Sequence, residues 1–295
     1  MRPSGHVVSH GVNNMDIQAI VVPYDSGHRG LRLGRGPEHL LERGLERRLG
    51  APGHAVRIEL VEANARFPSE NKTTFELLQL IAERVGAARA RGAFPLVLSG
   101  NCNSAVGALA GLDPARTGLI WFDAHGEFNT PETTSSGFLD GMGLAIAVGR
   151  CWQTIARTIP GYQPLPEANA ILVGGRDLDA EERRLLQGSG IALVRDGQIA
   201  EALTPALAAL RRRVEQVYVH IDLDILDPRE ARASSFAAPG GLTLAQMDEA
   251  IRAIGRALPL GGAGLAAYDP ACDSADRTLG AAFRLLEDLI AAAVL

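Results

Sequence analysis

Short apolar segments alternate with helical ones along almost the whole chain, and this alternation limits the fold more than any other feature. Runs such as 94–98 and 217–221 have the length of buried strands, whereas 72–91 repeats its apolar residues at helical spacing. Strands that alternate with helices form a parallel sheet with helices on both faces, so a single α/β domain is expected. The expected strands are 17–22, 56–60, 94–98, 119–122, 170–173, 191–194, 217–221 and 264–268. The expected helices are 37–50, 72–91, 205–216, 244–257 and 274–295, with three shorter ones beginning after Cys102, after Gly141 and at Asp179.

Length and composition restrict both the architecture and the partners. The 295 residues, 46% of them hydrophobic, are sufficient for the core of one large domain. The net charge of −5 gives no nucleic-acid footprint, and no apolar run approaches the roughly 18 residues of a membrane helix. We therefore expect a small-molecule partner and neither nucleic acid nor membrane.

The cysteines and the first residues bear on the cellular setting. Three cysteines without zinc-type CxxC spacing favour a reducing, cytoplasmic location. Residues 1–16 are polar and lack the apolar centre of a secretory signal, so they are expected to be a disordered lead-in, with Met15 as a second possible start. The folded domain is expected over 17–295.

Two acidic motifs directly follow expected strands. Asp123, His125 and Glu127 come at alternate positions after 119–122, and Asp222 and Asp224 come after 217–221. Alternate side chains of an extended chain point the same way, so each motif directs its polar groups in one direction. Carboxylate and imidazole groups so gathered suit a divalent cation.

The positions of these motifs favour one shared site over isolated loop acids or helix caps. Asp123 and Asp222 both fall at carboxyl ends of expected strands, and Cys102 follows another, 94–98. Ligands of open α/β sheets bind beyond these ends, so the sequence predicts a metal site there. Cys102 is either a ligand or a small buried apolar residue. His220 is either a partner of the ligands or part of the core.

Four motifs together resemble the arginase, or ureohydrolase, superfamily from about residue 17 to the end of the chain. They are SGNCNSAVG at 99–107, FDAHGEFNTPETTSSGFLDGMGL at 122–144, HIDLDILDP at 220–228 and APGGLT at 238–243. The resemblance implies a three-layer αβα sandwich with a mainly parallel, eight-stranded sheet. It also implies a dimanganese centre, hydrolysis of linear guanidino or formimino C–N bonds, and a homo-oligomer, commonly a trimer or hexamer.

The resemblance also assigns metal ligands, with two departures from the family pattern. Asp123 and Asp222 would bridge two metals, His125 and Asp224 would complete one site, and Cys102 and Glu127 would complete the other. The family has histidine at Cys102 and aspartate at Glu127. Manganese prefers oxygen and imidazole ligands, whereas thiolate favours zinc. One Mn²⁺ is therefore expected to bind firmly, and the second ion to bind weakly or to be Zn²⁺ or another divalent metal.

Proton transfer and substrate binding are assigned by the same resemblance. Asp140 stands where the family has a proton-shuttling histidine, and Asp140 or Glu127 would transfer protons here. The residues matching family substrate contacts are Asn129, Ser136, Asp179 and Glu182. Asp179 and Glu182 also have the spacing of a helix cap and its partner, which is the alternative for both. A family asparagine is Phe138 here, and the glutamate that grips guanidinium is Ala267.

The sequence therefore predicts a metal-dependent hydrolase of a linear amidine, guanidino or formimino C–N bond that does not act on arginine. Without the glutamate at Ala267, a guanidinium would lack its bidentate carboxylate partner. A catalytically inactive relative with a structural or regulatory role is the main alternative, because the altered positions cluster in one site. A further alternative is an enzyme with Cys102 as nucleophile, activated by His125 if the two are close in space.

Overall fold

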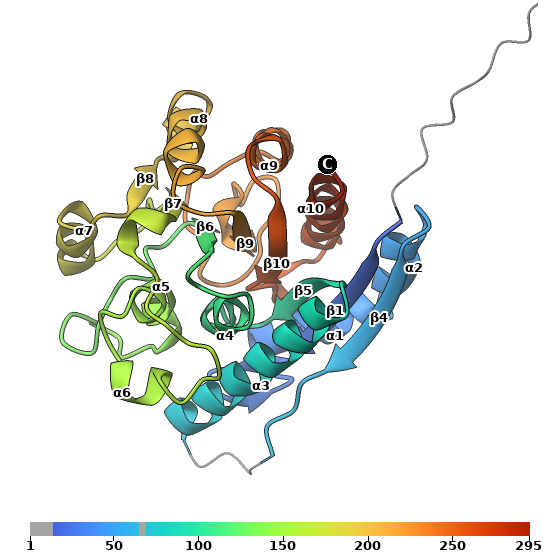
Figure 1. Cartoon of the computed structure of the whole chain (residues 1–295), viewed down its shortest axis with the longest axis horizontal. Coiled ribbons are helices and arrows are strands. Elements are labelled where there is room, and N and C mark those ends of the chain that lie inside the picture. Colours follow the sequence, from blue (N-terminus) through green and yellow to red (C-terminus); the bar gives the residue numbers. More distant parts are fainter. Residues whose placement is uncertain (1–13, 65–68) are drawn as a thin grey trace, which may run out of the picture.

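The computed structural model describes residues 14–64 and 69–295, and a parallel sheet forms the centre of this part (Figure 1). Its eight strands lie in the order β4-β1-β5-β10-β9-β6-β7-β8, and all neighbours pair in parallel. The strands are β1 (Asp16–Val22), β4 (Ala55–Leu60), β5 (Phe94–Ser99), β6 (Thr117–Asp123), β7 (Ala170–Gly174), β8 (Ala192–Val194), β9 (Gln216–Asp222) and β10 (Leu260–Ala266). A short hairpin of β2 (Tyr24–Asp25) and β3 (His28–Arg29) follows β1.

Helices cover both faces of this sheet, and each face has its own hydrophobic core (Figure 1). The three-layer αβα sandwich is therefore confirmed. One core contains side chains of α1 (Gly36–Glu42), α2 (Leu45–Gly50), α8 (Ile199–Leu210), α9 (Leu244–Ala257) and α10 (Arg277–Ala293). The other contains side chains of α3 (Glu70–Ala90), α4 (Ser104–Gly111), α5 (Gly143–Ala147), α6 (Gln153–Ala156) and α7 (Ala180–Gln187).

The central strands are buried along nearly their whole length. Every residue of β5, β6 and β10 is buried, and β9 is buried from Val217 onward. Strands covered by helices on both faces need such continuous apolar runs. By contrast, the edge strand β4 contains only exposed and half-buried residues. Polar side chains at the ends of the central strands are therefore the ones held most rigidly.

Gly44 divides the helix that the sequence predicts over 37–50. Its φ of 92° lies in the left-handed region, which glycine adopts without steric cost. The structure accordingly has α1 ending at Glu42 and α2 beginning at Leu45. The break turns α2 so that Leu45 and Leu49 are buried against the sheet.

Two other elements begin earlier in the chain than expected. Pro205, expected at the start of its helix, lies inside α8, whose buried Ile199, Leu203 and Leu207 extend the apolar face backward. The last strand, β10, begins at Leu260, because its small residues still pair with β9 and β5. Glycines lower strand propensity, which explains why the expected strand begins only at 264.

The expected lead-in over 1–16 falls mainly on residues 1–13, which lie outside the described residues, while Asp16 already opens β1. Within 14–64 and 69–295, none of the helices combines the length and apolar character that crossing a membrane requires.

Candidate metal centre

The two acidic motifs lie side by side because β6 and β9 are neighbours in register, with Phe122 opposite Ile221. Asp123 ends β6 and Asp222 ends β9. Each aspartate then caps the amide two residues later: Asp123 Oδ1 accepts from His125 N at 2.7 Å, and Asp222 Oδ1 accepts from Asp224 N at 2.7 Å. A tight turn at each strand end, rather than continued strand alternation, therefore positions His125 and Asp224.

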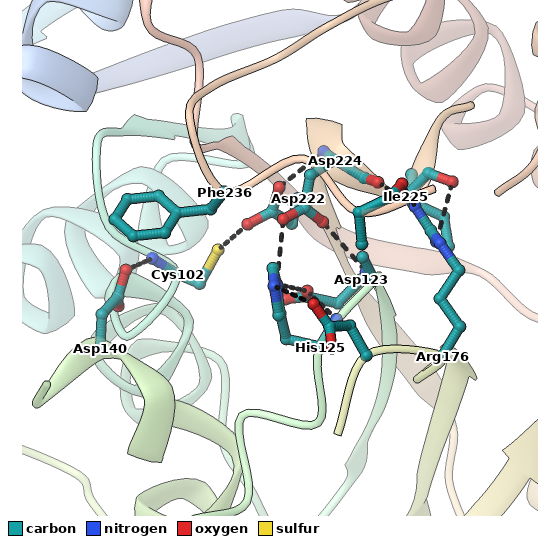
Figure 2. Close-up of polar contacts among 12 residues, drawn as sticks. Cys102, Asp123, His125, Asp140, Arg176, Asp222, Asp224, Ile225 and Phe236 are labelled. Carbon is teal, nitrogen blue, oxygen red and sulfur yellow. Dashed lines mark hydrogen bonds and ion pairs between the residues drawn. The ribbon is translucent and has the colours of Figure 1, made fainter. Parts of the chain in front are cut away.

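Asp123, His125 and Asp224, here called the His125 group, place three possible ligand atoms within 4.8 Å of one another. His125 Nδ1 lies 3.0 Å from Asp224 Oδ2 and 3.3 Å from Asp123 Oδ1, as Figure 2 shows. Burial lowers the pKa of His125, but its hydrogen bonds to Asp123 and Asp224 outweigh this and raise it far above the usual range. The two carboxylates therefore favour a positive charge between them.

Cys102, Asp123 and Asp222, here called the Cys102 group, form a second set of possible ligands, and all three are buried. The Cys102 thiol donates to Asp222 Oδ2 at 3.0 Å (Figure 2). Burial, together with the charges of Asp222 and Asp140, raises the pKa of Cys102 well above its usual range. Burial and neighbouring carboxylates also raise the pKa of Asp222. This group therefore holds a proton where a metal ligand would have to lose one.

Asp123 belongs to both groups, whereas Asp222 belongs only to the Cys102 group. The other oxygen of Asp123 accepts from Trp121 Nε1 at 2.9 Å, which fixes the carboxylate from two residues earlier on β6. Bridging of two metals by Asp123 and Asp222 stays a prediction.

Glu127 lines the cavity that also contains His125 and Asp222, but it lies outside both groups of possible ligands. Its φ of 52° is left-handed, so the chain has left the extended geometry on which alternate spacing depends. Its Oε2 is buried without a hydrogen-bond partner among the described residues. Burial, then the charges of Asp123 and Asp140, raises its pKa well above the usual range. Metal ligation and proton transfer by Glu127 both stay predictions.

Asp140 holds the turn that carries Cys102. It opens a short 3₁₀ helix (Asp140–Met142), and its carboxylate accepts from Cys102 N at 3.0 Å (Figure 2). It also accepts from Asn103 N and from Asn101 Nδ2, each at 2.8 Å. Burial raises its pKa to about 7, although these hydrogen bonds oppose the shift. Asp140 thus anchors the turn between β5 and α4, and its predicted proton transfer would have to coexist with that role.

The expected substrate contacts divide into two sets. Asn129, Asp179 and Glu182 line a cavity of about 220 Å³ beside the metal groups, whereas Ser136 does not line it. Asp179 precedes α7 without capping it through its side chain, and its Oδ2 accepts instead from Asn129 Nδ2 at 3.4 Å and from Ser135 Oγ at 3.3 Å. Asp179 is nevertheless the N-cap residue of α7, and the Glu182 carboxyl is hydrogen-bonded to the backbone of Asp179. The helix-cap alternative therefore describes the position of Asp179 and this contact of Glu182, but not the side chain of Asp179.

Glu182, on α7, supports the loop after β6. Its Oε1 accepts from Phe128 N at 2.9 Å, and a side chain at Gly126 would collide with its carboxyl group. Burial raises its pKa to about 7. Glu182 therefore fixes the segment between His125 and Asn129, besides lining the cavity.

Arg176 positions the main chain of Asp224, and no sequence motif indicates this role. Its guanidinium donates to Asp224 O at 2.7 Å and also to Ala238 O and Pro239 O, each at 3.2 Å. Figure 2 shows it on the far side of the Asp224 turn from His125. In the sequence, the feature that could indicate this role is an arginine two residues after the end of β7, the strand next to β6.

His220 belongs to the core beneath the site. It is fully buried, its ring centroid lies 4.3 Å from that of Trp121, and neither ring nitrogen has a hydrogen-bond partner among the described residues. Tyr218, two residues earlier on β9, is also buried, and a Cβ at Gly264 of β10 would collide with its hydroxyl. His220 therefore lies among core residues, which is the alternative that assigned it to the core.

Comparisons with known proteins agree with this architecture. The model of the arginase family matches residues 15–292. Arginase of Bacillus caldovelox is 32% identical over 226 residues, covering 74% of this chain and 75% of that protein. Arginase of Bacillus subtilis is 28% identical, covering 93% and 97%.

Solved structures give the same result at the level of the fold. A crystal structure of arginase from Bacillus subtilis superposes with a TM-score of 0.85 at 28% identity, covering 93% of this chain and 98% of that one. Formimidoylglutamase from Bacillus subtilis shares the fold at 17% identity, with a TM-score of 0.75, covering 97% and 89%. The family match extends over nearly the whole chain, and the chain therefore belongs to the arginase family.

Proposed function

We propose that this protein is a metal-dependent hydrolase of a linear C–N bond of the amidine, guanidino or formimino type, and that arginine is not its substrate. The observation that carries the proposal is the His125 group, in which two strand ends direct one imidazole and two carboxylates at a common point. Oxygen and imidazole donors of this kind suit Mn²⁺. When bound, the metal would supply Lewis-acid activation of water for attack on the substrate carbon.

The chain's own residues would hold the metal and orient the substrate beside it. Asp123, His125 and Asp224 would bind one ion, and Cys102 and Asp222 would share Asp123 in binding a second. The thiol favours Zn²⁺ or another soft ion in that second position. Asn129 and Asp179 line the cavity where they would contact the substrate, and the buried carboxyls of Glu127 and Asp140 would exchange protons with it.

Ala267 supports the exclusion of arginine. It lines the cavity, and its methyl group offers no acceptor for a guanidinium where the family resemblance places a glutamate. A cysteine mechanism has less support, because the thiol donates to Asp222 and its pKa is raised, whereas a nucleophile needs a lowered one. His125 is hydrogen-bonded to carboxylates instead of Cys102.

An inactive relative with a structural or regulatory role is the second candidate. The hydrogen bond from Cys102 to Asp222 favours it, because that group is already satisfied without a metal. We further propose a homo-oligomer, trimeric or hexameric, in the cytoplasm. The family resemblance and the three free cysteines support these assignments. Sedimentation analysis measures the oligomeric state.

The decisive experiment combines metal content with turnover. Elemental mass spectrometry of protein purified without added metal should find at least one divalent ion per chain. Manganese-loaded protein should release ammonia, urea or formamide from some member of a panel of amidines, guanidines and formimino compounds, with arginine among the poorest. Protein that binds no metal and hydrolyses no compound would overturn the proposal and favour the inactive relative. Preferred turnover of arginine would overturn the substrate assignment alone.

A further inference from the structure

Two phenylalanines meet where the cavity opens. Phe138 comes from the loop after β6 and Phe236 from the loop after β9, and their rings stack with centroids 5.8 Å apart and an interplanar angle of 20°. Both line the cavity that contains His125 and Asp224. Figure 2 shows Phe236 on the Cys102 side of the acidic cluster. An aromatic surface therefore adjoins the candidate metal centre directly.

Phe236 is 43% exposed, although burying a phenylalanine side chain stabilises a protein by about 1.5–3 kcal/mol. The stacked pair therefore leaves unused apolar area facing the cavity. Leu33 and Ala267 add further apolar lining. A ligand group that covers this area would gain the hydrophobic free energy that the protein alone does not realise.

Backbone hydrogen bonds hold the Phe236 loop in place. Arg176 donates to Ala238 O and Pro239 O on one side of Phe236, and Asp269 N donates to Ala233 O at 2.8 Å on the other. Phe236 N itself donates to Ser234 Oγ at 3.0 Å. A loop fixed at both ends loses little conformational entropy when a ligand packs on it.

A similar local turn holds the second ring. Phe138 N donates to Ser136 Oγ at 3.2 Å, and the following Leu139 is buried in the core. Ser136 thus helps to position Phe138, while its expected contact with substrate stays a prediction. The two rings form a preorganised aromatic surface.

The charge of the cavity lining excludes one kind of ligand. Asp177, Asp179 and Glu182 lie along its wall, and no described residue that lines it is Lys or Arg. A carboxylate on the ligand would meet these like charges, and the imidazole of His125 in the lining is already paired with Asp123 and Asp224. A cationic or neutral ligand would meet no such repulsion. The lining thus suits a positively charged compound with an apolar arm.

We propose that the substrate is an amidine or guanidine that carries a small aryl or alkyl arm and no carboxylate, and that Phe138 and Phe236 bind this arm. Because Ala267 leaves the amidine or guanidine group without a carboxylate partner, the contact with the two rings would supply binding energy that arginine cannot gain. The proposal rests on the hydrolase function proposed above. The cavity of about 220 Å³ is smaller than the roughly 300–1,000 Å³ of sites for drug-sized ligands, so the arm has about the size of one phenyl ring.

The kinetic test compares 2-phenylethylguanidine with methylguanidine and arginine on manganese-loaded protein. Phe138→Ala and Phe236→Ala should each lower kcat/KM for phenylethylguanidine roughly tenfold to a hundredfold, since contacts of this size in an apolar pocket give such ratios. Methylguanidine should change less than twofold. Phe236→Leu should restore much of the loss. Leu193→Ala, which removes another exposed apolar side chain on β8, is the matched control and should change neither.

Equal losses for both guanidines would overturn the proposal and show that the rings only maintain the fold. Faster turnover of methylguanidine in the alanine variants would also overturn it and identify the rings as a gate. A higher kcat/KM for arginine than for phenylethylguanidine would do the same.

A binding measurement separates this proposal from the hydrolase function. Calorimetric titration of phenylethylguanidine into metal-free protein should show binding that weakens at least tenfold in Phe236→Ala and remains unchanged in Leu193→Ala. Such binding without hydrolysis of any guanidine would support the aromatic site while overturning the proposed function. Absence of binding, or equal binding to all three proteins, would overturn the aromatic site whatever the enzyme hydrolyses.

Discussion

The His125 group and the Cys102 group share Asp123 but differ in chemistry and in surroundings. In the His125 group a half-exposed imidazole lies between two carboxylates, and Arg176 fixes the main chain of Asp224 from behind. In the Cys102 group a fully buried thiol donates its proton to Asp222, and Asp140 fixes the main chain at Cys102. Neighbouring strand ends thus support two groups that both hold a proton, one on an imidazole and the other on a thiol.

Position and donor chemistry are therefore separate requirements for a metal site. Both groups hold their atoms close enough to share an ion. In the His125 group a metal ion would replace the proton that the imidazole holds, and the neutral imidazole that remains is a good ligand. In the Cys102 group a metal must first displace a proton whose removal burial makes costly. The four experiments below test this contrast, in order of decreasing expected effect.

Asp222→Ala should have the largest effect, because it removes a ligand of the Cys102 group and the acceptor that positions Asp224 N. Metal content should fall to background and turnover should drop by more than roughly 100-fold, since losing even an outer partner of a ligand costs 10–100-fold. Elemental mass spectrometry and steady-state kinetics measure both. Asp227→Ala changes an acid of the same loop that pairs with Arg229, and it should retain metal. Retained turnover in Asp222→Ala would refute a metal mechanism.

Cys102→His should sharpen the contrast by giving both groups an imidazole. Metal content should rise from one ion per chain to two, because a neutral imidazole binds without losing a proton from a buried thiol. The measurement is elemental mass spectrometry after dialysis against metal-free buffer. Cys151→Ala, at another buried cysteine, is the control. Two ions already present in the wild type would contradict the contrast.

Arg176→Lys should weaken the His125 group selectively. A lysine cannot donate to the carbonyls of Asp224, Ala238 and Pro239 together, so Asp224 should lose part of its support. Affinity for the first metal should fall roughly 10–100-fold in a chelator competition titration. Arg184→Lys, at an exposed position of α7, should leave it unchanged. An equal loss in both variants would show that Arg176 has no special role.

Asp140→Asn should have the smallest effect. The asparagine offers one acceptor oxygen where the carboxylate accepts from three N–H groups, so buried donors lose partners. The free energy of unfolding should fall by about 1–3 kcal/mol, measured by urea denaturation. Asp177→Asn, a largely exposed carboxylate of the same cavity, is the control. A large loss of turnover with full stability would identify Asp140 as a proton-transfer residue more than an anchor.

The parallel sheet and the meeting of two acidic motifs follow from the sequence, because both depend on local patterns. Strand-length apolar runs mark β6 and β9, and parallel strands bring their carboxyl ends to one edge. The sequence alone therefore predicts that Asp123, His125, Asp222 and Asp224 lie together.

Other features depend on turns and on contacts between distant loops. Alternate spacing assumes an extended chain through Glu127, and the sequence gives no sign of the left-handed backbone that Glu127 adopts. The roles of Arg176 and Phe236 are not visible in the sequence, because they depend on the course of the loop after β9, which contacts Arg176 through Ala238 and Phe138 through Phe236. The sequence indicates a proton-transfer role for Asp140, whereas its role as an anchor is visible only from its three N–H partners.

Gly264 has a consequence for how this sequence can vary over evolution. Its missing side chain provides the space in which the Tyr218 hydroxyl lies, next to His220 and one strand away from the metal centre. A larger residue at 264 would collide with this hydroxyl and require Tyr218 to move. We therefore expect replacement of Gly264 to follow a change to a smaller residue at position 218. Such an order of substitutions would be recorded as paired changes at 218 and 264, even though neither residue touches the substrate.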